Sequence, residues 1–206
     1  MAAPPERPGP LIGAVLCGGR SRRFGTDKAL ADAGGRPLGA WVVDALRQAG
    51  ADPVVAVGGS AGTALGIPTI ADRNPGAGPL AALATVLLWA RTGLVVVAPC
   101  DLPLLRPDHL AALVAAAGPG RSGVAEVDGR AQPSLACWPA TLGPAIAALV
   151  RAGERAWQSA LAAGPWVAVP LPRQAVADAD TPASLQRLLA GTEPGHADCL
   201  GSPPGP

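Results

Sequence analysis

The stretch that most constrains the fold is an apolar run followed at once by a basic, glycine-rich segment. Residues 11–17 are apolar or small, and the chain continues as Gly-Gly-Arg-Ser-Arg-Arg-Phe-Gly-Thr-Asp-Lys, ending at Lys28. A buried strand that breaks into such a loop can direct uncovered backbone N–H groups at anionic oxygens. We therefore interpret residues 11–28 as a strand and a loop that bind the phosphates of a nucleoside triphosphate.

Lys28 is the first candidate for a functional side chain, because it is the only lysine among the 16 Lys and Arg residues of the chain. A lysine ammonium is a compact charge with rotating donors, whereas the arginine guanidinium is a planar fork. We expect a chain that otherwise uses arginine to keep lysine where this difference matters. The alternative is that Lys28 has no special role and is present by chance in an arginine-rich sequence.

Two common phosphate-binding motifs do not fit these residues. In a P-loop the lysine follows a glycine directly and precedes Ser or Thr, but Lys28 comes three positions after Gly25 and precedes Ala29. The glycines Gly18, Gly19 and Gly25 also lack the Gly-x-Gly-x-x-Gly spacing of dinucleotide-binding folds. An ordinary P-loop NTPase and a dinucleotide-dependent dehydrogenase are therefore excluded.

Length, charge and cysteine pattern limit the kind of protein that this sequence can encode. The 206 residues suffice for one domain with a sizeable core, which we expect over residues 11–190, between disordered tails at 1–10 and 191–206. A net charge of +1 argues against a nucleic-acid partner.

The chain shows no signal-peptide pattern and no apolar stretch of membrane-spanning length, so we expect a cytoplasmic protein with no membrane partner. The four cysteines have no Cys-x-x-Cys pairing and are expected to be reduced thiols.

Strand-like and helix-like segments alternate along the chain. Strands are predicted at 12–17, 53–57, 67–70, 94–98, 123–127, 134–138 and 166–169, and helices at 37–48, 80–90, 107–117, 142–151, 155–163 and 181–189. This order predicts an α/β fold, a single-domain Rossmann-like three-layer sandwich with a mostly parallel sheet. Ligands of such sheets bind at the carboxyl ends of the strands, where the basic loop, Asp72 and Asp101 fall.

Asp101 and Asp72 are the candidate acidic residues at that edge. Asp101 follows an apolar strand directly and lies between Pro99 and Pro103, which stiffen its turn. We predict that its carboxylate holds Mg²⁺ beside the substrate phosphates; the alternative is a capping role. Asp72 is predicted to contact the nucleotide or the acceptor, or else to form an Asx turn with Asn74.

No histidine is placed as a general base, since His109 falls on a predicted helix and His196 in a predicted tail. A phosphate monoester nucleophile needs none, because its second pKa of about 6 leaves it largely ionised at neutral pH. Positioning and charge neutralisation then suffice for phosphoryl transfer.

Several segments of the sequence resemble those of a known protein family. Leu16 to Lys28 resembles the Leu-Ala-Gly-Gly, Arg-x-Gly, Asp-Lys signature of nucleotidyltransferases, and in detail that of the molybdenum cofactor guanylyltransferases. Similar segments follow at Asp72 with Gly78-Pro79-Leu80-Ala81, at Pro99 to Pro103, at Gln132-Pro133, at Ala152 to Arg155 and at Asp180-Thr181-Pro182. Cys17, Ala82 and Asp180 depart from the family's usual Ala, Gly and Asn.

The resemblance implies a nucleotidyltransferase-type fold and transfer of GMP from Mg-GTP to molybdopterin, with release of pyrophosphate and formation of molybdopterin guanine dinucleotide. It implies Mg²⁺ as cofactor, GTP and molybdopterin as partners, and contact with molybdoenzyme-maturation proteins; we expect a monomer or weak oligomer. The resemblance places Leu16, Cys17, Gly18, Gly19, Lys28, Asp72 and Asp101 at the nucleotide, Asp101 at the metal, and Gly78, Pro133 and Arg155 at the acceptor. To these we add Arg22, for charge that develops in the transition state.

Two other functions stay open. A related enzyme would use CTP on molybdopterin or on another phosphorylated acceptor, and nothing in the residues alone selects guanine over cytosine. A non-catalytic nucleotide-binding module in cofactor delivery is the other alternative. The presence of both Lys28 and Asp101 favours catalysis, because a module that only binds could dispense with the metal ligand.

Overall fold

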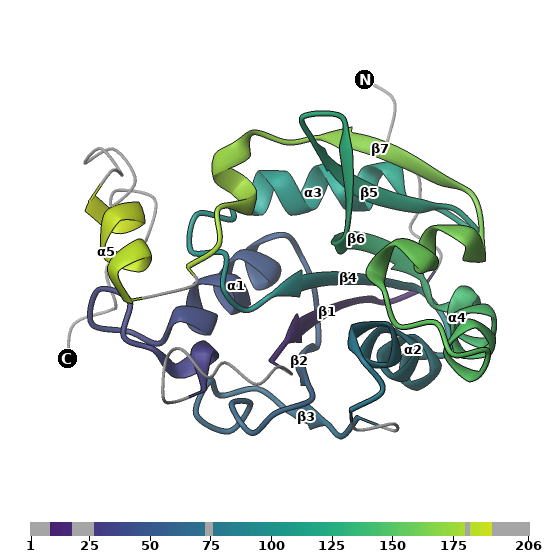
Figure 1. Cartoon of the computed structure of the whole chain (residues 1–206), viewed down its shortest axis with the longest axis horizontal. Helices are drawn as coiled ribbons and strands as arrows, with labels where there is room; N and C mark the ends of the chain where they lie inside the picture. Colours follow the sequence, from purple (N-terminus) through teal and green to yellow (C-terminus); the bar gives the residue numbers. More distant parts are fainter. Residues whose placement is uncertain (1–8, 18–26, 73–75, 180–181, 191–206) are drawn as a thin grey trace.

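The computed structural model describes residues 9–17, 27–72, 76–179 and 182–190, and these form one α/β domain around a seven-stranded sheet (Figure 1). The strands lie in the order β3-β2-β1-β4-β6-β5-β7. Their bounds are β1 Leu11–Leu16, β2 Val54–Val57, β3 Thr69–Ile70, β4 Leu94–Pro99, β5 Ser122–Val127, β6 Arg130–Pro139 and β7 Trp166–Pro170. All pairings are parallel except those of β6, which runs antiparallel to both β4 and β5. The predicted fold class and the mostly parallel sheet are confirmed.

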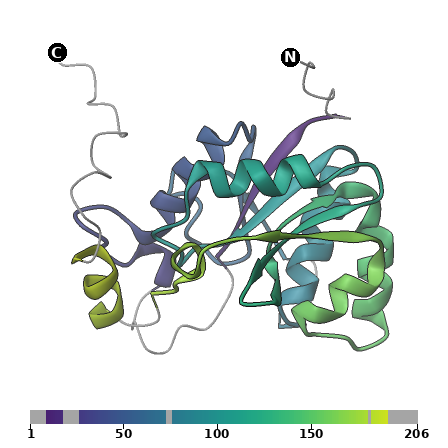
Figure 2. The ribbon, with the colours of Figure 1, turned by 90° about the horizontal axis from the view of Figure 1, so that it is seen from above.

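Helices cover both faces of the sheet, which gives the expected three layers (Figure 2). Helices α1 (Leu38–Gln48) and α3 (Pro107–Ala116) pack on one face. Helices α2 (Pro79–Ala90) and α4 (Gly143–Arg151) pack on the other. A fifth helix, α5 (Pro182–Ala190), lies at one end of the molecule, beyond the start of α1.

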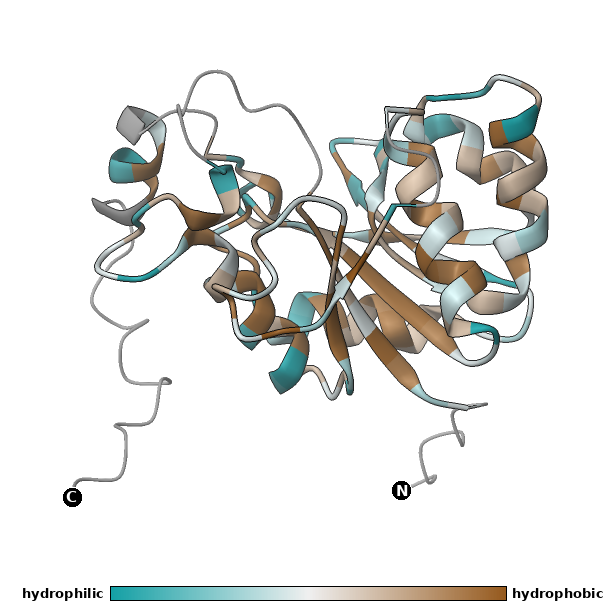
Figure 3. Ribbon diagram, turned by 90° about the horizontal axis from the view of Figure 1, so that it is seen from below, coloured by the Kyte–Doolittle hydropathy of each residue, from teal (hydrophilic) through white to brown (hydrophobic). Residues whose placement is uncertain are grey.

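The central strands are apolar because both of their faces are buried. In β1, Leu11 and Val15 join the core cluster beneath α1 and α3, whereas Ile12 and Ala14 join the cluster beneath α2 and α4. Figure 3 shows the consequence, since the strands at the centre of the sheet are coloured as hydrophobic along most of their length. Continuous apolar runs of this kind are typical of parallel strands buried on both sides.

The predicted elements agree with the observed ones except in three places. The strand predicted at 67–70 is shorter, since β3 covers only Thr69–Ile70. Residues 155–163, predicted as a helix, form a 3-10 helix only over Trp157–Ala163, because Ala156 is extended and Gly164 ends the segment. Strand β6 begins at Arg130 rather than 134. Its extra residues pair with β5 through a tight hairpin in which Asp128 (φ 50°) and Gly129 (φ 72°) take left-handed conformations.

Three short 3-10 turns, Lys28–Leu30, Ala140–Leu142 and Arg173–Val176, carry no periodic signal and were not predicted. The expected tails fall at residues 1–8 and 191–206, outside the described residues, apart from Gly9 and Pro10. Among the described helices, none has the length and apolar character needed to cross a membrane.

Candidate active site

An ion pair between Lys28 and Asp101 lies at the carboxyl edge of the sheet. The Lys28 Nζ atom is 2.5 Å from Asp101 Oδ2, although the two residues are 73 positions apart in the sequence. Only 14% of the Lys28 side chain and 19% of the Asp101 side chain are exposed. A charge-assisted hydrogen bond this short, largely shielded from water, fixes both side chains relative to each other. The two residues predicted to act on phosphate and metal are therefore brought together.

Lys28 is held by the local backbone at the start of a 3-10 turn. The Asp27 carboxylate accepts a hydrogen bond from the Ala29 N–H at 3.1 Å and so caps the turn. The Ala31 N–H then donates to the Lys28 carbonyl at 3.2 Å, and the Leu38 N–H donates to the Ala31 carbonyl at 2.8 Å. These bonds connect the turn to the first residue of α1, so the lysine projects from an ordered segment.

Asp101 is held by the end of β4 and by a distant part of the chain. The Cys100 N–H donates to the Leu16 carbonyl at 3.3 Å, which extends the pairing of β4 with β1 up to the residue before Asp101. On the other side, the Ala179 N–H donates to the Asp101 carbonyl at 3.0 Å. The chain just before α5 therefore fixes the backbone of the candidate metal ligand.

Asp72 also lies at this edge, two residues after β3, and is held by a residue that the sequence did not single out. The Thr85 hydroxyl of α2 lies 3.3 Å from Asp72 Oδ1, to which it donates a hydrogen bond. Thr85 is only 1% exposed, in a helix whose other residues are all apolar. A single polar residue within the apolar run Leu80–Ala90 is the signal that could have identified it, since buried hydroxyl groups require partners.

Leu16 ends β1, and Cys17 follows it close to a glycine turn that comes after β2. The backbone of Gly59 has φ 64°, and a Cβ atom built there would lie 2.6 Å from the Cys17 carbonyl oxygen. Only glycine allows both the left-handed backbone and this close approach. The strand end that carries two predicted nucleotide contacts is therefore supported by the end of its neighbour.

The three described cysteines, Cys17, Cys100 and Cys137, are buried and form no disulfide bonds. The Cys100 thiol makes a hydrogen bond with Cys17, and this contact, burial and the nearby Asp101 and Asp27 carboxylates raise the pKa of Cys100 far above its usual range. Cys100 therefore stays protonated and packs as a small apolar side chain.

The predicted acceptor residues lie at the same edge, on the side of β6 and α2. Gly78 (φ 89°) precedes α2, and a Cβ atom there would lie 3.3 Å from both Cβ and Cδ of Arg155, so the glycine makes room for the arginine. Pro133 is buried in β6, next to the register shift between β5 and β6. Because β6 runs antiparallel to β4, its first residues lie at the carboxyl edge of β4.

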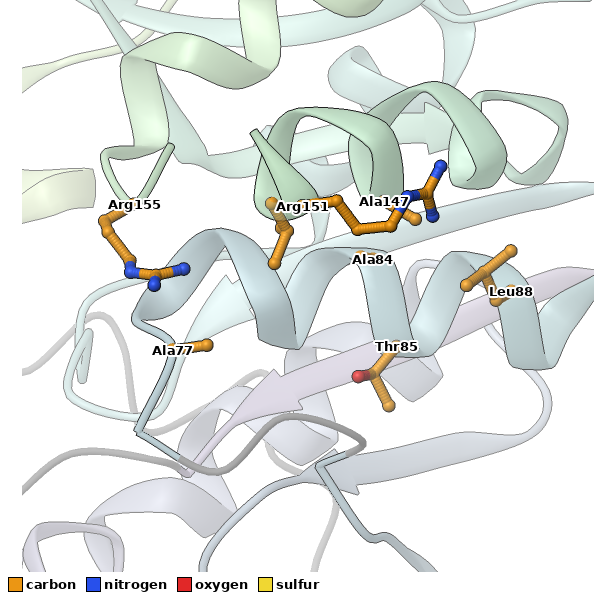
Figure 4. Close-up of a pocket in the computed structure, with 8 residues that line it drawn as sticks. Ala77, Ala84, Thr85, Leu88, Ala147, Arg151 and Arg155 are labelled. Carbon is orange, nitrogen blue, oxygen red and sulfur yellow. The ribbon is translucent and has the colours of Figure 1, made fainter. Parts of the chain in front are cut away.

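A pocket of about 510 Å³ lies between α2 and α4, and Arg155 is one of the residues that line it (Figure 4). Arg155 lies over the first turn of α2 and Leu88 near the other end of that helix. Thr85 also lines the pocket, so the pocket borders the residue that holds Asp72. Its remaining lining residues are Ala77, Ala84, Ala147, Val150 and Arg151.

Gly18, Gly19 and Arg22, predicted to contact the nucleotide and the transition state, lie outside the described residues. Among the residues that are described, no cluster of three or more His, Cys, Asp or Glu side chains could hold a metal ion. Mg²⁺ is commonly held by one or two carboxylates together with substrate phosphates and water. A partly exposed carboxylate that already binds a cationic group, as Asp101 does, fits that ion.

The arrangement is suited to the polyphosphate of a nucleotide. It combines an ammonium and a hard oxygen ligand at the carboxyl edge of a parallel sheet, with a second carboxylate two residues beyond β3. Two unit charges 4 Å apart interact by about 4 kcal/mol at an effective dielectric constant of about 20, so a metal and a lysine together can offset several phosphate charges.

Comparison with known proteins agrees with this geometry. Residues 13–166 match the model of the MobA-like NTP transferase domain. The chain is 37% identical over 150 residues to a molybdenum cofactor guanylyltransferase of Cereibacter sphaeroides, a match that covers 70% of this chain and 77% of the relative.

Solved structures share the fold. The molybdopterin-guanine dinucleotide biosynthesis protein A of Archaeoglobus fulgidus superposes with a TM-score of 0.69 at 23% identity, over 86% of this chain and 96% of that one. A Mycobacterium tuberculosis protein in complex with manganese superposes with a TM-score of 0.67 at 21% identity, over 89% of this chain and 100% of that one. The match to the family model covers most of the chain and includes Lys28, Asp72 and Asp101. The chain therefore belongs to the MobA-like NTP transferase family and is a nucleotidyltransferase of molybdenum cofactor biosynthesis.

Proposed function

We propose that the protein transfers GMP from Mg-GTP to molybdopterin, releasing pyrophosphate and forming molybdopterin guanine dinucleotide. The observation that carries the proposal is the Lys28–Asp101 pair at the carboxyl edge of a MobA-like domain. The guanylyltransferase name of the Cereibacter sphaeroides relative supports guanine as the base and molybdopterin as the acceptor.

In the proposed reaction an oxygen of the acceptor's terminal phosphate forms a bond to the α-phosphorus of GTP. The bond from the α-phosphorus to the bridging oxygen of the β-phosphate breaks, and pyrophosphate leaves with that oxygen. Lys28 would bind the phosphates, and its charge would stabilise the leaving group. Leu16, Cys17, Gly18 and Gly19 would contact the nucleotide through their backbone.

Asp101 would hold the divalent metal ion together with the triphosphate. When bound, Mg²⁺ supplies charge neutralisation and orientation of the phosphates. The manganese complex of the Mycobacterium tuberculosis protein supports a divalent ion in this fold. Asp72, held by Thr85, would contact the nucleotide, and Arg22 would stabilise charge in the transition state.

The acceptor would lie over Gly78, Pro133 and Arg155, on the other side of Asp101 from β1. Arg155 is exposed and beside the start of α2, where its guanidinium can pair with an acceptor phosphate. We further propose that residues 11–190 are the catalytic domain, that the protein acts in the cytoplasm as a monomer or weak oligomer, and that maturation proteins take up its product.

The binding half of the proposal is tested by thermal shift with GTP, CTP, ATP and UTP, each with Mg²⁺. A ligand at 100 times its Kd stabilises the folded state by about 2.7 kcal/mol, which corresponds to a Tm increase of about 5–10 °C for a chain of this size. We expect a GTP-selective increase that is reduced in Asp101→Asn and retained in Asp108→Asn, which changes an exposed carboxylate on α3. A CTP-selective increase would favour the cytidylyltransferase alternative, and no increase with any nucleotide would contradict the proposal.

A further inference from the structure

Lys28 and Asp101 already neutralise each other in the structure. Their 2.5 Å contact uses one carboxylate oxygen of Asp101 and places a full positive charge beside it. Both side chains are more than four-fifths shielded from solvent. An ion pair in such surroundings is much less screened by salt and water than a surface pair.

The backbones on both sides of this ion pair are anchored. Lys28 begins a 3-10 turn that is capped by Asp27, and the Asp101 carbonyl is bound by the Ala179 N–H. Separation of the two charges therefore requires rotation of the side chains rather than displacement of either loop. The lysine side chain has four rotatable bonds and can turn toward a new anionic partner.

A divalent ion would bind the same carboxylate whose Oδ2 atom the ammonium now contacts. Mg²⁺ binds oxygen ligands at about 2.0–2.1 Å, and a second cation at that distance from Asp101 would lie against the ammonium. A free metal ion at either oxygen of this carboxylate therefore meets repulsion from the Lys28 ammonium or displaces it, which breaks the ion pair with Asp101. A nucleotide triphosphate removes this penalty, because its phosphates provide a new partner for the ammonium.

We propose that Lys28 acts as an internal counter-ion for Asp101, which excludes free divalent metal and couples metal binding to arrival of the nucleotide. The ammonium holds the carboxylate in place until metal and triphosphate enter together. The inference rests on the proposed function only in taking Asp101 as the metal ligand. It does not depend on which base or acceptor the enzyme uses.

The test is direct binding of Mn²⁺ alone, measured from the electron paramagnetic resonance signal of the free ion. Wild type is expected to bind Mn²⁺ weakly. Lys28→Met, which removes the charge and keeps most of the side-chain length, is expected to bind Mn²⁺ at least about tenfold more tightly, within the range of typical coupling between sites. Lys28→Arg keeps a positive charge and should bind as weakly as wild type.

Two further variants test whether the gain in Mn²⁺ affinity comes from removal of the Lys28 charge beside Asp101. Arg36→Met removes the charge that pairs with Asp44 at 2.6 Å and should leave Mn²⁺ affinity unchanged. The double variant Lys28→Met with Asp101→Asn should lose the gain of the single variant. Lys28→Gln, which keeps a polar head group, replaces Lys28→Met if circular dichroism shows that the methionine variant is unfolded.

Equal Mn²⁺ affinity in wild type and in the folded neutral variants would overturn the proposal. A gain that persists in the double variant would also overturn it, because the metal would then bind elsewhere. Neither result bears on GTP selectivity, so the transfer proposal stands or falls separately on the nucleotide panel.

Discussion

The Lys28–Asp101 ion pair should contribute measurably to folding stability, and a double-mutant cycle can isolate its share. Exposed ion pairs are worth about 0–1 kcal/mol, whereas breaking a fully buried pair costs about 3–5 kcal/mol. With exposed fractions of 14% and 19%, this pair lies between those limits. We therefore expect a coupling free energy of about 2 kcal/mol, below the roughly 4 kcal/mol that Coulomb's law gives at 4 Å and an effective dielectric constant of about 20.

The cycle compares wild type, Lys28→Met, Asp101→Asn and the double variant by urea unfolding without nucleotide or metal. The double variant should be less destabilised than the sum of the single variants by the coupling free energy. The exposed Arg173–Asp128 pair, with a 2.7 Å contact and side chains 80% and 50% exposed, provides a matched control cycle. Its coupling should stay below about 1 kcal/mol. Additivity within about 0.5 kcal/mol at Lys28 and Asp101 would refute the reasoning.

Three other changes have defined outcomes. Gly59→Ala should lower the unfolding free energy by at least about 2 kcal/mol and by more than Gly66→Ala, because both have φ near 65° but only the first Cβ meets a backbone carbonyl; urea unfolding measures both, and equal losses would contradict the packing argument. Thr85→Val should weaken nucleotide binding at least about threefold in calorimetry by releasing Asp72, and unchanged affinity would exclude this positioning role. Burial lowers the pKa of His109, so the unfolded state binds the proton at a higher pH than the folded state does. The unfolding free energy should therefore fall as the pH drops below about 6.5, by under about 1 kcal/mol because the site is partly exposed. His109→Gln keeps the side-chain acceptor that caps α3 and should remove this pH dependence of urea unfolding.

The elements that sequence could predict are those with a strong local signal. The β-branched run before Asp101 and the alternation of strands and helices specified both the fold class and the edge at which the site lies. Lys28 stood out because no other lysine competes with it. Its pairing with Asp101 follows from the topology of the sheet. Lys28 comes after the loop that follows β1 and Asp101 comes directly after β4, and these two neighbouring strands are parallel, so both end at the carboxyl edge.

The supporting contacts could not be predicted in the same way. The bond from the Ala179 N–H to the Asp101 carbonyl joins backbone groups, which every residue type carries, so no sequence pattern marks it. Thr85 left a weaker signal, a single hydroxyl within an apolar helix, whose partner could only be known from the fold. The sequence predicts a helix at residues 155–163, but the structure has a 3-10 helix at Trp157–Ala163. Seven residues are too few for hydrophobic periodicity to distinguish a 3-10 helix from an α-helix.

The measurement that tests the central claim most directly is product formation from GTP, molybdopterin and Mg²⁺, with pyrophosphate and the dinucleotide cofactor both quantified. We predict equal amounts of pyrophosphate and molybdopterin guanine dinucleotide, no pyrophosphate without acceptor, and loss of both products in Lys28→Met and Asp101→Asn. Tight, GTP-selective binding with no pyrophosphate in the presence of molybdopterin would contradict the account and would identify the chain as a nucleotide-binding module instead.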